Sequence, residues 1–160
     1  MKEDYFRHAY GEDFREVIAF FNRLEEAIPY NYLVQKFPTQ GDFYHPELVK
    51  NFEKVEHIVD EFAPFVQAHK NMPYRAQTVS YRMLARYLEY CKGLAAALIK
   101  KANGEEQEAL DAYNALRIDL GKHELEMERW YDQQMCFASL GRIFTAFLDP
   151  QKKADFAIMQ

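Results

Sequence analysis

The stretch LAAALIKKANGEEQEA, residues 94–109, decides the fold of this chain. An apolar stripe leads into the stretch and another leaves it, and both repeat in alternating steps of four and three residues. That spacing keeps the apolar side chains on one face of an α-helix. Gly104 separates the two stripes, and glycine readily adopts the left-handed conformation that ends a helix. The sequence therefore predicts an antiparallel helical hairpin that turns at Gly104.

The two predicted helices extend over residues 74–148 and differ in length. At about 1.5 Å per residue, the first arm of about 30 residues spans ~45 Å, and the second, of up to about 43 residues, spans ~65 Å. The second arm therefore extends beyond the first, unless Gly121 or Gly141 bends it. We expect the aromatic N-terminal helices to cover its apolar side chains, which are Phe137, Phe144 and Phe147.

The first half of the chain predicts further helices. A short helix should end at Tyr10, a break should follow at Gly11, and a second helix should cover about 12–28. Residues 29–45 predict a loop. A third helix should begin at Pro46 and end near Asn71, with a kink or an early stop at Pro64.

The predicted fold is therefore an all-α antiparallel helical bundle of four to five elements, built on the long hairpin. We expect one domain over residues 1–148 and a C-terminal tail over residues 149–160. The chain of 160 residues is long enough to bury a core without disulfides or metals.

Charge and hydropathy argue against two classes of partner. A net charge of -5 gives no electrostatic reason to expect nucleic acid. The longest apolar run, Leu94 to Ile99, is far too short to span a membrane, and the charged N-terminus does not resemble a signal peptide. We therefore expect a cytoplasmic protein that binds neither nucleic acid nor a membrane.

The densest group of titratable residues lies within Lys122 to Asp132. Glu124, Glu128 and Asp132 are four residues apart and share one helical face, where they could bind a metal or act as an acid and base pair. Alternatively they form a solvated face, or they pair with Arg82 and Arg86 on the other arm. We favour the structural interpretation and expect no metal.

His123 lies on the apolar stripe and is either a ligand, a general base or a buried core histidine. A metal-dependent enzyme would need it to meet His57 or His69. The sequence has no Glu-x-x-His pair and no HExxH motif, so we expect a core histidine. Ser80, Ser139, Cys91 and Cys136 lack the sequence context of a nucleophile, and no glycine-rich phosphate loop occurs. We therefore predict no catalytic residue and no cofactor.

The aromatic loop at residues 29–45 is the remaining candidate site. Tyr30, Tyr32, Tyr44 and His45 combine flat apolar faces with hydrogen-bonding groups, a mixture that suits a sugar surface. The alternative is that these side chains close the end of the bundle or dock on a neighbouring domain.

Two stretches resemble a known family. DYFRHAYGEDFR, residues 4–15, resembles the Tyr-Phe…Tyr-Gly entry to the C-terminal helical domain of large bacterial glycoside-hydrolase-like proteins. These multidomain chains have a hexosaminidase-like or glucuronidase-like part and a TIM-type barrel. Residues 94–109 are similar to the helical hairpin of the same domains, and the likeness extends over nearly the whole chain.

The resemblance implies an accessory piece of a carbohydrate-active enzyme. The first hypothesis is a non-catalytic helical domain that packs on a glycosidase barrel and lends the loop at Tyr30 to His45 to the substrate cleft. The chain of 160 residues contains no barrel, so the resemblance transfers no catalytic residue. A second hypothesis is a free-standing helical module for protein interaction or dimerisation. The expected partner is accordingly a catalytic domain or a second copy of the chain.

Overall fold

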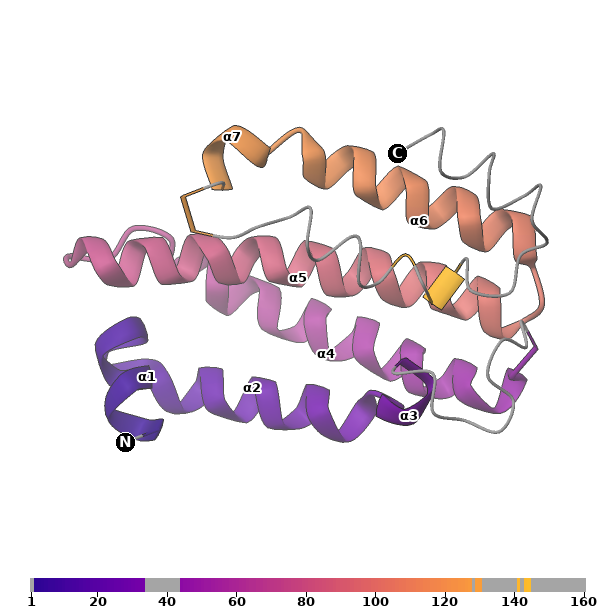
Figure 1. Cartoon of the computed structure of the whole chain (residues 1–160). Helices are drawn as coiled ribbons and strands as arrows, with labels where there is room; N and C mark the ends of the chain where they lie inside the picture. The colour runs from indigo at the N-terminus through magenta and orange to yellow at the C-terminus, as the bar shows by residue number, and fades with distance from the viewer. Residues whose placement is uncertain (1, 34–43, 128, 131–140, 142, 145–160) are drawn as a thin grey trace. The chain divides into compact units, whose positions relative to one another are not determined.

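The computed structural model describes residues 2–33, 44–127, 129–130, 141 and 143–144, and these residues form helices joined by short connections (Figure 1). Over this part of the chain no β-strand occurs, and the β-type pairing is a single bridge between Tyr44 and Asn103. The prediction of an all-α fold is confirmed. The elements are α1 (Lys2–Tyr10), η1 (Gly11–Asp13), α2 (Phe14–Ala27), α3 (Tyr30–Leu33), η2 (Pro46–Leu48), α4 (Val49–Ala68), α5 (Arg75–Ala102), α6 (Glu106–Gly121) and α7 (Glu124–Met127).

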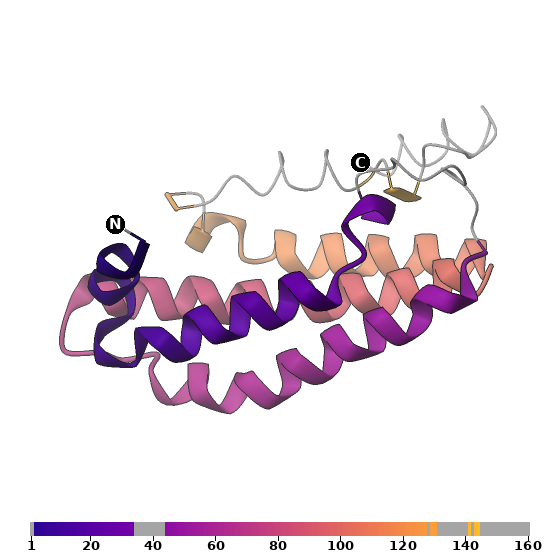
Figure 2. The same cartoon turned by 90° about the horizontal axis from the view of Figure 1, so that it is seen from below.

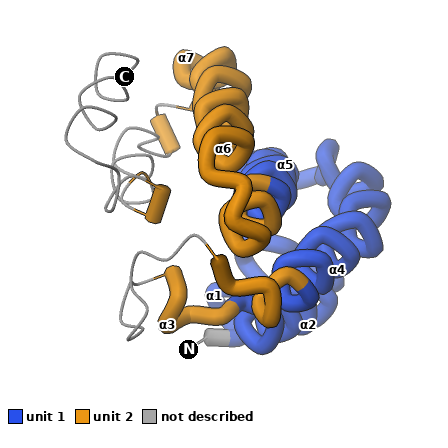
Figure 3. Tube along the Cα trace, turned by 90° about the vertical axis from the view of Figure 1, so that its right-hand side faces the viewer, with its two compact units in different colours: residues 1–28, 50–96 blue, residues 29–49, 97–160 orange. Residues whose placement is uncertain are grey.

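The chain divides into two compact units (Figure 3). Unit 1 comprises 1–28 and 50–96, and unit 2 comprises 29–49 and 97–160. Helix α5 begins in unit 1 and ends in unit 2. The single domain at 1–148 with a tail at 149–160 stays a prediction. None of the helices in the described residues is long and apolar enough to cross a membrane.

The turn at Gly104 joins α5 to α6, as the hairpin prediction requires. Gly104 has a φ of +82°, which is the left-handed region that favours glycine. Its N–H donates to the carbonyl of Lys101, and the N–H of Glu105 donates to the carbonyl of Lys100, both at 3.0 Å. This pair of bonds satisfies carbonyls that the end of a helix would otherwise leave open. Gly104 therefore ends α5 and reverses the chain.

The second arm of the hairpin is shorter than the apolar stripe predicts. Helix α6 ends at Gly121 after 16 residues, so the expectation of a continuous helix of up to about 43 residues is wrong. The interruption falls at Gly121, one of the two glycines at which a bend was the alternative. Glycine contributes to the interruption, since it costs about 1 kcal/mol relative to alanine inside a helix, although α5 continues through Gly93. Phe137 and Phe147 lie outside the described residues. Phe144 stacks on Tyr113 with ring centroids 4.6 Å apart.

Unit 1 has its core between α2, α4 and the first part of α5 (Figures 1 and 2). Phe20 of α2 stacks on Phe62 of α4 at 4.3 Å, and Phe21 contacts Tyr87 of α5 at 5.8 Å. These aromatic residues of the N-terminal helices thus have partners within their own unit. Helix α4 continues through Pro64 to Ala68, so the early stop at Pro64 does not occur.

The predicted break at Gly11 is confirmed, because Gly11 has a φ of +79° between α1 and η1. Helix α1 packs back on α2 through Phe6, whose ring lies 6.1 Å from that of Phe21. Tyr10, the last residue of α1, contacts Tyr81 of α5 with centroids 5.3 Å apart. The reversal at Gly11 therefore brings α1 onto the core of unit 1.

The aromatic loop of unit 2 is partly helical, which corrects the prediction of an irregular segment over residues 29–45. The N–H of Tyr32 and the N–H of Leu33 both donate to the carbonyl of Pro29, and this closes the single turn α3. The proline supplies a fixed φ at the start of a turn and needs no donor there. Residues 34–43 lie outside the described part of the chain.

Candidate functional site

The candidate site of unit 2 is a buried group of side chains that we name the Tyr32 cluster: Tyr32, His45, Glu47 and Lys101. Tyr32 comes from α3, Glu47 from η2, and Lys101 from the last turn of α5. The backbone N–H of His45 donates to the carbonyl of Ala102 at 2.7 Å, beside the bridge between Tyr44 and Asn103. These backbone bonds attach the end of the aromatic loop to the end of α5.

Lys101 is only 3% exposed and binds Tyr32 in two ways. Its Nζ donates a hydrogen bond of 2.9 Å to the Tyr32 hydroxyl and also lies 4.3 Å from the centroid of the Tyr32 ring. A buried ammonium is costly unless it is compensated. The hydroxyl oxygen and the negative face of the ring both stabilise the charge. Tyr32 therefore helps to compensate the burial of the Lys101 ammonium.

His45 is 5% exposed and packs edge-on against Tyr32 with ring centroids 5.4 Å apart. Its Nδ1 lies 3.0 Å from Oε1 of Glu47, which is exposed. The pKa of Glu47 is lowered, chiefly by a bond from its own backbone N–H and then by His45. His45 thus links the buried ring of Tyr32 to a carboxylate at the surface.

Burial raises the pKa of Tyr32, and the nearby charge of Glu47 raises it further. The hydroxyl therefore stays protonated at neutral pH, where it can share hydrogen bonds but cannot act as a base. The cluster is suited to holding the aromatic loop in place, and it offers no activated nucleophile in this form.

The structure divides the four candidate residues of the aromatic loop into two pairs. Tyr32 and His45 lie together in the Tyr32 cluster, whereas Tyr30 is 65% exposed and Tyr44 is 67% exposed. The buried pair cannot contact a ligand from solution, and the exposed pair can.

Sequence reasoning missed Lys101, although a signal for it was present. The apolar stripe of the first arm passes through Leu94 and Leu98, and the next position of the same face is Lys101. A lysine on a buried stripe predicts a partner inside the core, because its ammonium is rarely buried without one. The partner, Tyr32, lies 69 residues earlier in the sequence, so the stripe alone could not identify it.

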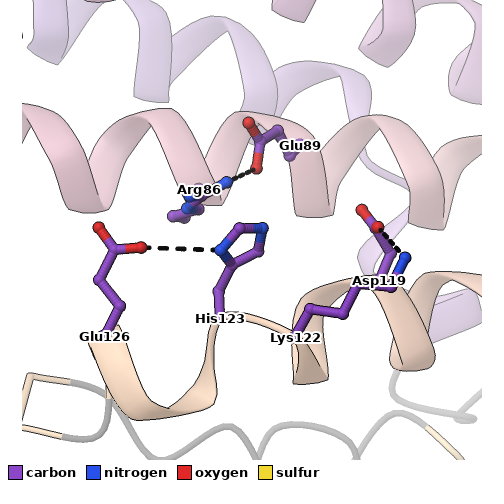
Figure 4. A network of polar contacts seen from close by, with 6 residues as sticks. All are labelled: Arg86, Glu89, Asp119, Lys122, His123 and Glu126. Atoms are coloured by element: carbon purple, nitrogen blue, oxygen red, sulfur yellow. Dashed lines mark hydrogen bonds and ion pairs between the residues drawn. The ribbon is translucent and has the colours of Figure 1, made fainter.

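The group around His123 forms local pairs (Figure 4). Nδ1 of His123 lies 3.6 Å from Oε2 of Glu126, and Lys122 pairs with Asp119 at 3.0 Å. The side chain of His123 is 34% exposed, so the expectation of a core histidine is wrong. The physical reason is the end of α6 at Gly121, which places His123 in a turn instead of on a continuous helical face.

The predicted acidic face is only partly within the described residues. Glu124 is exposed in α7, while Glu128 and Asp132 lie outside the described part. On α5, Arg82 donates to Asn71 and Arg86 pairs with Glu89 at 2.8 Å (Figure 4). Among the described residues, no group of three or more histidine, cysteine or acidic side chains is arranged to hold a metal ion.

Comparisons of the chain with protein-family models, with curated proteins and with solved structures found no match. The resemblance to the helical domain of glycoside-hydrolase-like proteins thus rests on residues 4–15 and 94–109 alone.

Proposed function

We propose that this chain is a non-catalytic helical accessory domain of a carbohydrate-active enzyme, and that Tyr30 and Tyr44 are its ligand contacts. The observation that supports the proposal is the division of the aromatic loop: Tyr30 and Tyr44 are exposed, and each has a near neighbour, Tyr32 or His45, that is buried. The resemblance of the two stretches supplies the class of enzyme.

The buried pair matters for binding by the exposed pair, because a side chain loses conformational entropy when it binds a ligand. Tyr30 lies in the same helical turn as Tyr32, and Tyr44 directly precedes His45. The buried neighbours hold the backbone at both points through the Lys101 hydrogen bond and the bond from His45 to Ala102. Two tyrosine rings on a fixed backbone lose less entropy on binding than rings on a mobile loop.

Tyrosine also suits a sugar surface chemically. Its ring offers a flat apolar face to the C–H groups of a pyranose, and its hydroxyl can donate or accept a hydrogen bond. The net charge of -5 favours a neutral or N-acetylated sugar over a polyanionic one.

The test is isothermal titration of the chain with N-acetylhexosamine oligosaccharides and with neutral glucan oligosaccharides. We expect weak binding to one of these classes, and a loss of about tenfold or more in affinity for Tyr30→Ala combined with Tyr44→Ala. Tyr74→Ala is the matched control, because Tyr74 is 71% exposed and belongs to unit 1. Binding that Tyr74→Ala weakens as much as the double variant would count against the proposal.

A second candidate function is self-association or binding of another protein through unit 2. Ile118, Leu125 and Trp130 are large apolar side chains that are exposed in the described structure. Exposed apolar groups of this size favour protein contacts. Sedimentation velocity over a wide range of concentrations should then show a dimer that Leu125→Ser weakens, and a monomer at every concentration would exclude self-association.

A further inference from the structure

Unit 1 contains a histidine whose two ring nitrogens both face hydrogen-bond acceptors. His69 follows the end of α4, and its Nδ1 lies 2.7 Å from the carbonyl oxygen of Phe65. Its Nε2 lies 3.2 Å from Oδ2 of Asp13 in η1. The ring also stacks on Tyr81 of α5, with centroids 4.9 Å apart and planes at 25°.

The chemistry of the two acceptors determines which form of the ring fits. A carbonyl oxygen only accepts, and an ionised carboxylate only accepts. A neutral imidazole has one N–H and one lone pair, so it can satisfy only one of these partners. The imidazolium has two N–H donors and satisfies both.

We propose that His69 is a proton-dependent latch, which as an imidazolium ties η1, and through it α1, to the end of α4 and releases Asp13 when it loses its proton. The proton that leaves is the one on Nε2, because the Nδ1 contact with the carbonyl of Phe65, at 2.7 Å, is shorter than the Nε2 contact with exposed Asp13, at 3.2 Å. The lone pair of Nε2 then faces the carboxylate of Asp13, and the contact becomes repulsive.

The groups that face His69 come from each element packed against it. Asp13 is the charged group in contact with the ring, Phe65 of α4 supplies the carbonyl, and Tyr81 of α5 covers one face. Tyr81 in turn donates a hydrogen bond of 3.1 Å to the carbonyl of Tyr10. Burial, and to a lesser degree Asp13 and Tyr10, raises the pKa of Tyr81 to about 12. Tyr81 thus stays neutral over the range in which histidines titrate.

The latch acts on α1 because Asp13 and Tyr10 flank the reversal at Gly11. The hydrogen bond from Tyr81 to Tyr10 holds the end of α1 directly, and the ring of His69 supports Tyr81 from its stacked face. Loss of the contact with Asp13 removes one of the attachments of η1 to the rest of unit 1.

His57 provides a control within the same unit, where its carboxylate partner Glu61 also pairs with Arg23. Its Nε2 lies 3.0 Å from Oε1 of Glu61, and its side chain is 71% exposed. Like His69 it pairs with a carboxylate, but water surrounds the ring and can supply whichever donor or acceptor a given form needs. The His57 pair should therefore have no comparable effect on the structure.

The first test is nitrogen NMR of the histidine rings in the full chain, at about pH 5 and at about pH 8. We expect both nitrogens of His69 to carry protons at the lower pH and Nδ1 alone to carry one at the higher pH. Amide exchange at residues 11–14 should be faster at the higher pH than the intrinsic pH dependence of exchange accounts for. A ring that is protonated on Nε2 alone at the higher pH would overturn the latch.

The second test is Asp13→Asn, with Glu61→Gln as its control. The asparagine amide can donate to the lone pair of neutral Nε2, so the additional pH-dependent loosening at residues 11–14 should disappear. For a partly exposed pair such as this, the expected change in the local opening equilibrium is no more than about fivefold. Glu61→Gln should leave the loosening unchanged. Loosening that persists in Asp13→Asn would refute the proposal, and the ring NMR of the unsubstituted chain decides the question even if this variant folds poorly.

Discussion

His45 in unit 2 and His69 in unit 1 occupy similar positions, since each lies where an irregular segment meets a helix. The interactions that hold the two side chains differ. His45 is buried against Tyr32, whose hydroxyl and ring also stabilise the cation Lys101. His69 is partly exposed. Both histidines meet a carboxylate, Glu47 for His45 and Asp13 for His69, but the second ring nitrogen of His69 also faces the carbonyl of Phe65. The Tyr32 cluster therefore depends on burial and packing, whereas the His69 latch depends on a proton.

The two regions should therefore respond differently to substitution and to pH. Removing a hydrogen-bond acceptor from a buried cation should damage unit 2 at every pH. Removing the carboxylate beside His69 should alter unit 1 mainly by changing its response to pH. The substitutions that follow separate these sensitivities, beginning with the largest effect.

Tyr81→Ala should produce the largest loss, because it removes a fully buried ring that supports both His69 and Tyr10. Deleting a buried aromatic side chain costs about 3–5 kcal/mol of unfolding free energy. Urea denaturation followed by circular dichroism measures the loss. Tyr87→Ala on the same helix is the control, since Tyr87 is 38% exposed and should cost clearly less. Equal losses of unfolding free energy in the two variants would show that the buried ring of Tyr81 stabilises unit 1 no more than the exposed ring of Tyr87 does.

Tyr32→Phe should come next, because it removes the hydroxyl that accepts the hydrogen bond of buried Lys101. A buried charged donor left without that acceptor costs about 1–3 kcal/mol of unfolding free energy. Lys101→Met removes the charge at similar volume, so Tyr32→Phe should cost much less in that background. A double-mutant cycle by urea denaturation measures the coupling. Additive effects would mean that the hydroxyl does not compensate the ammonium.

Gly11→Ala in unit 1 and Gly121→Ala in unit 2 compare a glycine that has a positive φ with one that does not. At a φ of +79° an alanine is strained, and its Cβ would lie 3.3 Å from Nε2 of Gln77. We expect a loss of about 1–2 kcal/mol in unfolding free energy. Gly121→Ala should instead be neutral or stabilise by up to ~1 kcal/mol, because an added Cβ there meets nothing within 4 Å. Thermal denaturation measures both effects. The unfolding midpoint of Gly11→Ala should be lower than that of the unsubstituted chain, and the midpoint of Gly121→Ala should be unchanged or higher.

The smallest effect near neutral pH concerns the tyrosine hydroxyls of unit 1. Burial first, and nearby charges second, raise the pKa values of Tyr10 and Tyr81 from 10.0 to about 12. Because the folded state favours the protonated form, this stability is complete below pH 10 and is lost as the pH rises towards 12. Denaturation at a series of alkaline pH values should show the loss, and Tyr81→Phe should make it shallower. If the unfolding free energy of Tyr81→Phe fell with pH as steeply as that of the unsubstituted chain, Tyr81 would not contribute to the alkaline loss of stability.

The hairpin was predictable because its signals are local. Steps of four and three residues place apolar groups on one face, and Gly104 ends α5 where the stripe is interrupted. The same stripe overestimated the second arm, since it continues past Gly121 although the helix does not. Periodicity reports which face would be buried if a helix formed, but it does not report where the helix ends: α5 continues through Gly93, whereas α6 ends at Gly121.

The candidate site was predictable only in part. The composition of residues 29–45 identified an aromatic loop whose side chains would either meet a ligand or pack, and Tyr32 and His45 are buried. Which tyrosines would remain exposed depends on Lys101 and Ala102, which belong to a distant part of the sequence. Local patterns carry no information on such partners. The His69 latch was missed for the same reason, because Asp13 and His69 meet only after the chain has folded back.

The proposal that unit 2 presents Tyr30 and Tyr44 to a sugar is tested most directly by amide NMR of the unsubstituted chain during titration with N-acetylhexosamine and glucan oligosaccharides. We predict saturable shifts that centre on residues 30–33 and 44–48. No saturable shift with either class, or shifts centred on Tyr74 and its neighbours in unit 1, would contradict the proposal.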